Sequence, residues 1–226
     1  MLKFLPYILH TLYFNFKYLP FQQALKLPIL LYKPKLISLK GIVKIESPTI
    51  ATGMIKLGVN RVSIYKNNGI SWENKGGVCV FKGKCTIGNS SFVSLGKKGK
   101  LIFGNEFSAT AAFKVVSYNQ IEFGNEVQIG WENIFIDTDF HTLTNLASGL
   151  PKKAVSPIKI GSNNWFGLKS VVLKGVQTPD FCTIGAYSLL NKKYLISPYT
   201  LIAGNPASLK STGVYWDRQN DKISEE

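Results

Sequence analysis

A six-residue spacing of apolar residues is the feature that most limits how this chain folds. Apolar residues, several followed by glycine, recur at every sixth position in three stretches. Such a period cannot follow one face of an α-helix, whose faces recur at about 3.6 residues. It predicts a parallel β-helix in which each hexapeptide supplies one short strand and one turn, and inward side chains stack from coil to coil. The residues in register are Phe81, Ile87 and Val93; Phe123, Ile129 and Phe135; and Ile160, Phe166, Val172, Thr178, Ile184 and Leu190.

Coil length follows from the same spacing. Three hexapeptides close one triangular coil, and the phrase FGNE at residues 103–106 returns at 123–126, one such coil with two inserted residues. The 226-residue chain is long enough for one main core. We therefore predict an all-β fold: a helical segment over residues 1–45, one parallel β-helix over 46–210, and a tail over 211–226.

The regular spacing stops at Asp137, within NIFIDTDFHTLTN, and resumes at Ile160. Residues 138–157 are therefore predicted to form a loop excursion with His141 at its root. A loop on a rigid scaffold is a common place for functional residues. An imidazole suits proton removal near neutral pH, which makes His141 a candidate general base. Asp137 or Asp139 could hold its tautomer.

Positive charge is concentrated in the first half of the chain. Residues 1–100 contain 16 Lys and Arg against Glu46 and Glu73, whereas residues 101–226 contain 11 basic and 11 acidic residues. The net charge of +14 therefore leaves two interpretations open: a solvated basic surface, or a face for an anionic partner, either a membrane surface or a phosphate-bearing substrate. No helix-turn-helix, zinc-finger or RNA-binding signature accompanies it, so nucleic acid is not expected.

The first forty residues are rich in Leu, Phe and Tyr, and four prolines divide them into short pieces. The longest uncharged run, Phe4 to Phe16, has 13 residues, too short for a bilayer span, and no signal-peptide cleavage site follows. We predict two or three short amphipathic helices in this segment, and two roles are open for them. They either lie on an anionic membrane or cap the first coil. The cap would bury Phe4, Tyr7, Leu12, Phe16 and Phe21.

The stretches IGSNNWFGLKSVVLKGV, TIGAYSLLNKK and LIAGNPASLK resemble the closing coils of the hexapeptide-repeat acyltransferases. The resemblance covers about residues 53–210, although Thr178 and Tyr187 depart from the usual pattern. It implies a left-handed β-helix and transfer of acetyl from acetyl-CoA to a sugar hydroxyl, for which we choose bacterial surface polysaccharide as the acceptor. It also implies a homotrimer with CoA bound between neighbouring subunits.

The resemblance also implies roles for single residues. His141, in DTDFH, falls on the family's catalytic base, with Asp139 behind it, and Trp165 on a donor to the oxyanion. Asn119, one 20-residue coil before Asp139, would lie at the same corner and could hold the acceptor. Contacts to acetyl-CoA fall on Gly167, Leu168, Gly185 and Ala186 for the pantetheine arm, and on Asn191, Lys192, Asn205, Pro206 and Lys210 for the nucleotide end.

Other activities are less compatible with the composition. A γ-class carbonic anhydrase needs three histidine ligands, whereas His10 and His141 are the two histidines here, so no metal is expected. Three cysteines without CxxC spacing, Cys79, Cys85 and Cys182, favour a reducing compartment, here the cytoplasm or the inner face of its membrane. A non-catalytic β-helix that binds glycan is the alternative that stays open.

Overall fold

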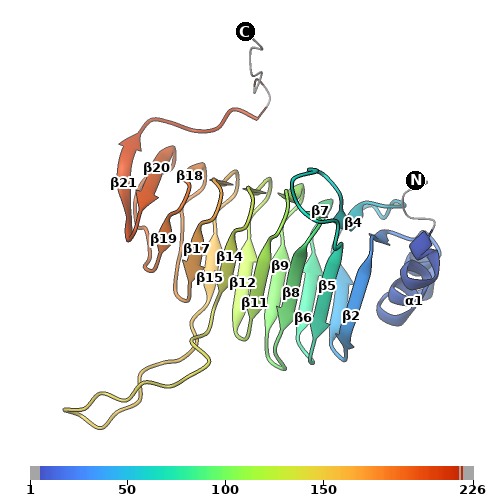
Figure 1. Ribbon diagram of the computed structural model, residues 1–226, viewed down its shortest axis with the longest axis horizontal. Coiled ribbons are helices and arrows are strands. Elements are labelled where there is room, and N and C mark those ends of the chain that lie inside the picture. The colour runs from blue at the N-terminus through green and yellow to red at the C-terminus, as the bar shows by residue number, and fades with distance from the viewer. Residues whose placement is uncertain (1–5, 219, 221–226) are drawn as a thin grey trace.

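The computed structural model describes residues 6–218 and 220, and it shows a β-helix of triangular cross-section closed at one end by helices (Figure 1). Strands of successive coils pair in parallel, so three sheets form the sides of a prism. We call them sheets A, B and C. The helices are α1 (Ile8–Tyr18) and α2 (Phe21–Ala24). No helix in the described residues is both long and apolar enough to cross a membrane.

Each coil contributes one strand to each sheet until the last coils, where sheet C is reduced to single bridges. Sheet A contains β1 (Ile29–Leu31), β4 (Ile55–Val59), β7 (Cys85–Gly88), β10 (Phe107–Ala109), β13 (Gln128–Ile129), β16 (Trp165–Phe166), β18 (Cys182–Ile184), β20 (Thr200–Gly204) and the antiparallel β21 (Ala207–Thr212). Sheet B contains β2 (Pro34–Leu39), β5 (Ile70–Asn74), β8 (Ser91–Leu95), β11 (Lys114–Ser117), β14 (Ile134–Ile136), β17 (Val171–Leu173) and β19 (Leu189–Leu190). Sheet C contains β3 (Ile42–Ile45), β6 (Val78–Phe81), β9 (Lys100–Phe103), β12 (Gln120–Phe123) and β15 (Ile158–Ile160).

The predicted repeat is confirmed. Phe166 pairs with Ile184 and Val172 with Leu190, which is the 18-residue coil, and Phe103 pairs with Phe123, which is the 20-residue coil. All the apolar residues in the predicted register are buried. The predicted start at residue 46 is wrong, because β1, β2 and β3 already form the first coil within residues 1–45.

Stacked aromatic rings fill the interior of the prism. Phe81 and Phe103 stack with ring centroids 5.3 Å apart, and Phe103 and Phe123 stack at 5.6 Å. Each such pair adds about 0.5–1.5 kcal/mol beyond the burial of its area. This column forms because the parallel register places equivalent residues directly above one another.

The two departures from the family pattern fit the coil. Tyr187 has φ of 57°, the left-handed conformation that Lys169 adopts at the equivalent turn one coil earlier. Thr178 is buried and its hydroxyl accepts a hydrogen bond from the Gly161 amide at 3.2 Å. Neither residue interrupts the stacking.

Helix α1 caps the first coil. Asn15 bonds both backbone groups of Ile29, at 2.7 Å and 3.2 Å, and the Thr11 hydroxyl accepts from the Leu31 amide at 3.1 Å. The Phe14 ring lies 5.3 Å from Trp72. These side chains satisfy the open edge of β1, which would otherwise be free to pair with another strand.

The predicted cap is therefore confirmed, but with different residues from those expected. Tyr7 and Leu12 are only half-buried, and Phe16 and Phe21 are exposed. Phe4 lies outside the described residues. The prediction favoured the most apolar side chains, whereas the edge of β1 needs polar partners.

Candidate active site

An arm made of residues 138–157 leaves the prism after β14 and returns at β15, at the corner between sheets B and C (Figure 1). We call this the arm corner. Antiparallel bridges join Thr138 to Val155 and Thr144 to Pro151, so the two legs run side by side. The predicted excursion is confirmed, and the regular coil resumes at Ile158.

Asp137 fixes the root of the arm. Its buried carboxylate accepts hydrogen bonds from the Ser117 hydroxyl at 3.1 Å and from the amides of Tyr118 at 2.7 Å and Asn119 at 2.9 Å. Burial raises the pKa of Asp137, while these donors oppose the shift by stabilising the carboxylate. Asn119 thus lies at the same corner as the arm, as its spacing predicted.

His141 lies on the outgoing leg with an exposed side chain. Asp139, predicted to orient it, is instead ion-paired with Lys174, whose ammonium also donates to the Lys153 carbonyl at 2.7 Å. In the described part of the chain, neither Asp137 nor Asp139 hydrogen-bonds to His141. The imidazole is accessible to a substrate or a second chain, and its role as a base stays a prediction.

A hollow of about 540 Å³ opens on the outer side of sheet A, where it turns into sheet B. We call this the glycine corner. The four residues predicted to hold the pantetheine arm, Gly167, Leu168, Gly185 and Ala186, all line it. The other lining residues are mainly apolar: Gly130, Trp131, Trp165, Phe166, Thr183, Ile184 and Leu201.

Glycine is needed along this row because successive coils touch there. A Cβ on Gly167 would lie 2.7 Å from the Ala186 nitrogen, and one on Gly130 would lie 2.8 Å from the Phe166 carbonyl oxygen. Among the described residues, the amides of Leu168 and Ala186 find no hydrogen-bond acceptor. The hollow therefore offers two donors one coil apart, about 4.8 Å, to a ligand that carries amide carbonyls.

Trp165 stands at the edge of the hollow, 38 % exposed, with its ring 5.8 Å from that of Trp216. The prediction that it lies one coil on from His141 is wrong, because Trp165 pairs with Gln128 in sheet A, whereas the arm leaves between sheets B and C, where Ile136 pairs with Leu173. Within one chain the two residues therefore lie apart. The oxyanion role of Trp165 stays a prediction.

The residues predicted at the nucleotide end divide between two places. Asn205 and Pro206 form the turn from β20 to β21, and the Lys210 Nζ lies 3.9 Å from the Cβ position of Gly204. These residues continue the glycine corner by one coil. Asn191 and Lys192 instead follow β19 at the arm corner, so within one chain the five residues lie at two corners, and their contacts to acetyl-CoA stay a prediction.

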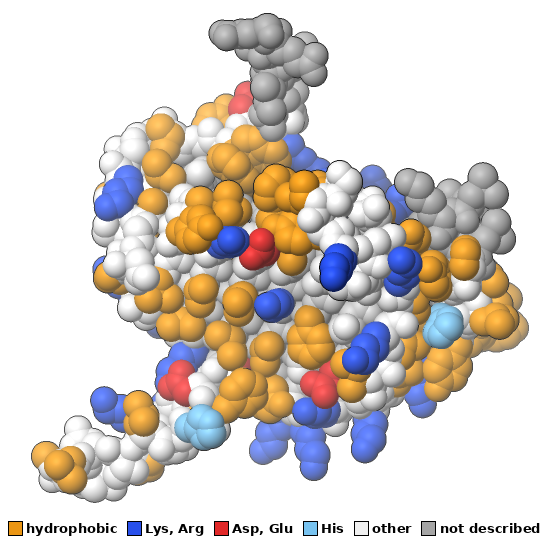
Figure 2. Space-filling view, viewed as in Figure 1, with side chains coloured by type: hydrophobic (Ala, Val, Ile, Leu, Met, Phe, Trp, Pro, Cys, Tyr) orange, Lys and Arg blue, Asp and Glu red, His pale blue; other side chains and the backbone are white. Residues whose placement is uncertain are grey.

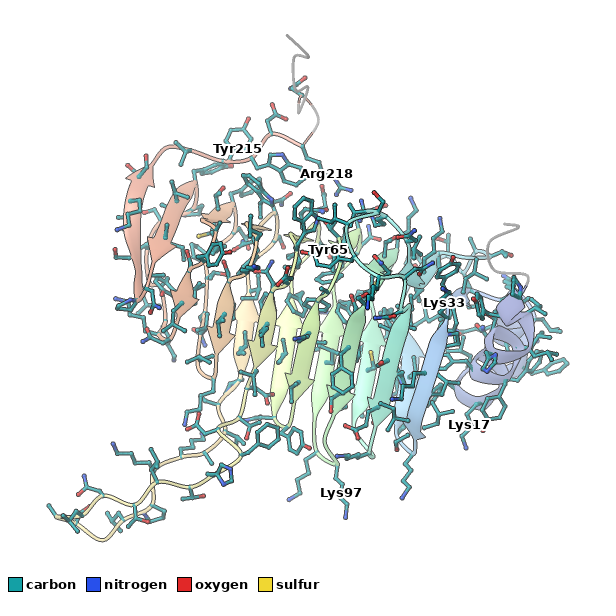
Figure 3. All side chains as sticks on the ribbon, viewed as in Figure 1. Lys17, Lys33, Tyr65, Lys97, Tyr215 and Arg218 are labelled. Atoms are coloured by element: carbon teal, nitrogen blue, oxygen red, sulfur yellow. The ribbon has the colours of Figure 1, made fainter. Side chains whose placement is uncertain are left out.

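The two corners lie at opposite edges of sheet B. Tyr65, from the loop over residues 60–69 that joins β4 to β5, marks the glycine-corner edge, and Lys97, from the turn between β8 and β9, marks the other (Figure 3). The outer face of sheet B between them is aliphatic over the later coils. Apart from Lys114 on β11, its outward side chains are Val116, Ile134, Ile136, Val171, Leu173 and Leu189.

Several contributing residues were not found from the sequence. The Tyr65 hydroxyl donates to Glu132 at 2.6 Å, and its ring lies 6.2 Å from Trp131, so the loop over 60–69 covers one end of the hollow. The run Asn67, Asn68 and Gly69 is a turn signal that could have indicated this loop. Nothing in the sequence marks Lys174 as the partner of Asp139. Groups of three or more His, Cys, Asp or Glu side chains that could hold a metal are absent from the described residues.

Comparison with known proteins shows similarity to named acetyltransferases over part of the chain. A Schizosaccharomyces pombe protein named "Putative acetyltransferase" is 33 % identical over 105 residues, 46 % of this chain and 49 % of that protein. A Klebsiella pneumoniae protein named "Uncharacterized 24.8 kDa protein in cps region" is 28 % identical over 160 residues, 71 % of this chain and 70 % of that protein. No family model matches the chain.

Among solved structures, the polySia-specific acetyltransferase NeuO matches with a TM-score of 0.57 at 18 % identity, covering 87 % of this chain and 92 % of NeuO. The chain has the fold and the repeat pattern of the hexapeptide-repeat acyltransferases. Its β-helix is accordingly left-handed, as the resemblance implied. The chain spans about half the length of the Schizosaccharomyces pombe relative, so the activity is argued separately below.

Proposed function

We propose that this hexapeptide-repeat protein is an acetyl-CoA-dependent O-acetyltransferase that modifies a sugar hydroxyl, with His141 as general base. The observation that carries the proposal is the hollow, which gathers the four predicted pantetheine residues beside two unpaired amide donors. The similarity of the fold to NeuO, a polySia-specific acetyltransferase, supports a polysaccharide acceptor here. We place the activity in the cytoplasm or at the inner face of the cytoplasmic membrane.

The reaction needs few groups. The imidazole of His141 removes the proton of the sugar hydroxyl while its oxygen attacks the thioester carbonyl of acetyl-CoA. The tetrahedral intermediate collapses, the C–S bond breaks, and the departing sulfur receives the proton from the imidazolium. Trp165 could donate its indole N–H to the oxyanion.

Direct transfer is favoured over an acetyl-enzyme. All three cysteines are buried, and burial raises the pKa of the Cys182 thiol to about 11 and that of Cys79 further still. A buried thiol that stays protonated is a poor nucleophile. The acetyl group therefore passes straight from CoA to the acceptor.

The active site is completed by a second copy of the chain. His141 and the hollow lie at opposite edges of sheet B, and the aliphatic strip between them is suited to contact with a neighbour. A closed three-fold arrangement would place the arm of one copy beside the hollow of the next. We therefore propose a homotrimer with three shared sites.

The first test is a mass-spectrometric screen for acetylated products with acetyl-CoA and nucleotide sugars, oligosaccharides or lipid-linked glycans. A transferred acetyl group identifies the acceptor, whereas binding of glycan without any transfer would favour the non-catalytic scaffold. Complementation then tests the shared site. At sub-saturating acetyl-CoA, co-assembled His141→Ala and Ala186→Trp chains should be more active than either variant alone, and failure to gain activity would place the site within one chain.

A further inference from the structure

The helical cap distributes its side chains in an unexpected way. Its buried face consists of Thr11, Phe14 and Asn15, two of them polar. The opposite face of α1 carries Leu9 and Tyr13, which are 75 % and 57 % exposed. The helix therefore turns its more apolar side away from the protein.

The apolar surface extends from α1 to α2. Phe16 continues the stripe of Leu9 and Tyr13 at helical spacing, and its ring lies 5.9 Å from that of Phe21. Phe21 and Leu25 are 68 % and 59 % exposed. We call these five residues the cap face, and Figure 2 shows hydrophobic side chains gathered at the α1 end of the molecule.

Capping the β-helix does not explain this surface. A terminal cap in a repeat protein needs an apolar inner side and a polar outer side for solubility. At the other end, β21 comes closer to that rule, because the exposed Leu209 is accompanied there by three exposed polar residues, Ser208, Lys210 and Thr212. A contiguous exposed apolar patch on a soluble chain marks a contact with another molecule.

The charged residues around the cap face indicate which kind of molecule it contacts. Lys17 lies beside the stripe on α1 (Figure 3), and Lys26 is exposed just after α2. The first hundred residues as a whole carry 16 basic and two acidic residues. Leucine and aromatic side chains bordered by lysines are typical of helices that lie in the interface of an anionic bilayer.

We propose that the cap face binds the surface of an anionic lipid bilayer, with the axis of the β-helix directed away from the membrane. The apolar side chains of α1 and α2 would enter the headgroup region while Lys17 and Lys26 contact lipid phosphates. The proposal does not depend on the proposed catalytic function.

The test is co-sedimentation of the full chain with vesicles of phosphatidylglycerol and phosphatidylcholine, compared with phosphatidylcholine alone, at low and high salt. The chain should bind the anionic vesicles more tightly, and less so at high salt. Phe21→Ser with Leu25→Ser should weaken binding tenfold or more. Lys17→Gln and Lys26→Gln should each cost about fivefold on anionic vesicles.

Two controls accompany the test. Leu146→Ser, at a fully exposed leucine on the arm, should leave vesicle binding unchanged. The variants of the cap face should keep the melting temperature of the wild type, which would show that they still fold. Absence of vesicle binding would overturn the proposal. So would light scattering showing that Phe21→Ser dissociates a pair of molecules joined through this face, because the occupant would then be a second copy.

Discussion

The glycine corner and the arm corner are built from the same coils but differ in how they use them. At the glycine corner, small residues let successive turns pack closely, and a hollow that could hold a ligand forms on the surface. At the arm corner, the chain leaves the coil for 20 residues, 138–157, and carries His141 outward. On the proposed function, the comparison teaches that one repeat fold can carry the binding hollow and the base at different corners, which only a second copy would bring together.

The largest expected effect separates chemistry from binding. His141→Ala should lower acetyl transfer by about 10²-fold or more, because it removes the proton acceptor. Affinity for acetyl-CoA should change little, since the residues proposed to hold the pantetheine arm, which line the hollow, are left intact. Steady-state kinetics with the acceptor found by screening, together with calorimetric titration of CoA, measures both. Leu146→Ser is the matched arm control, and near-normal turnover in His141→Ala would end the base assignment.

The next effect concerns the root of the arm. Asp137→Ala should lower the free energy of unfolding by about 2 kcal/mol, because two backbone amides lose their buried acceptor. Denaturant titration measures this change. Asp139→Ala should change the free energy of unfolding by less than about 1 kcal/mol, because the Asp139 carboxylate and its ion pair are partly exposed. Equal losses in the two variants would show that Asp137 has no special anchoring role.

A third prediction is specific to the glycine corner. Ala186 is exposed, so Ala186→Trp should fold normally but fill the hollow and weaken acetyl-CoA binding about tenfold or more. Leu195→Trp, at an exposed position outside the hollow, provides the control for adding a large ring. Titration calorimetry measures the affinity for acetyl-CoA, and an unchanged value in Ala186→Trp would show that acetyl-CoA binds elsewhere.

The smallest effect concerns the loop that covers one end of the hollow. Tyr65→Phe should lower the free energy of unfolding by about 1 kcal/mol, because it removes the hydrogen bond from the Tyr65 hydroxyl to Glu132. Burial and the neighbouring Glu132 raise the pKa of Tyr65 from 10.0 to about 12. This raised pKa contributes stability below pH 10 that is lost as the pH rises towards 12.

Unfolding titrations at pH 9 and at about pH 12 should therefore show a smaller loss of stability in Tyr65→Phe than in the wild type. Tyr18, whose pKa is also raised to about 12, titrates in both proteins and cancels in the difference. Identical pH profiles would mean that Tyr65 is not held at Glu132 in solution.

Local sequence was sufficient to predict the repeat, because every coil carries the same six-residue spacing of inward residues. Phe166, Ile184 and Ile202 each point inward for the same reason, a period of six on a strand-turn unit, and they stack in register. The arm was equally visible as a break in that period after Asp137. The cap was predicted in place but not in detail, because polar Thr11 and Asn15 meet unpaired backbone groups of β1 that no periodicity reveals.

The sequence by itself determined the coil, its length, the excursion and the candidate base, since each depends on residues close together in the chain. Tertiary structure alone decided which side of the prism each candidate faces. The sequence predicts Trp165 one coil on from His141, yet Trp165 lies in sheet A, one coil on from Gln128, and Lys174 pairs with Asp139 at the root of the arm. The side that a residue faces depends on how insertions shift the turns around the axis, and that shift is fixed only when the coils stack.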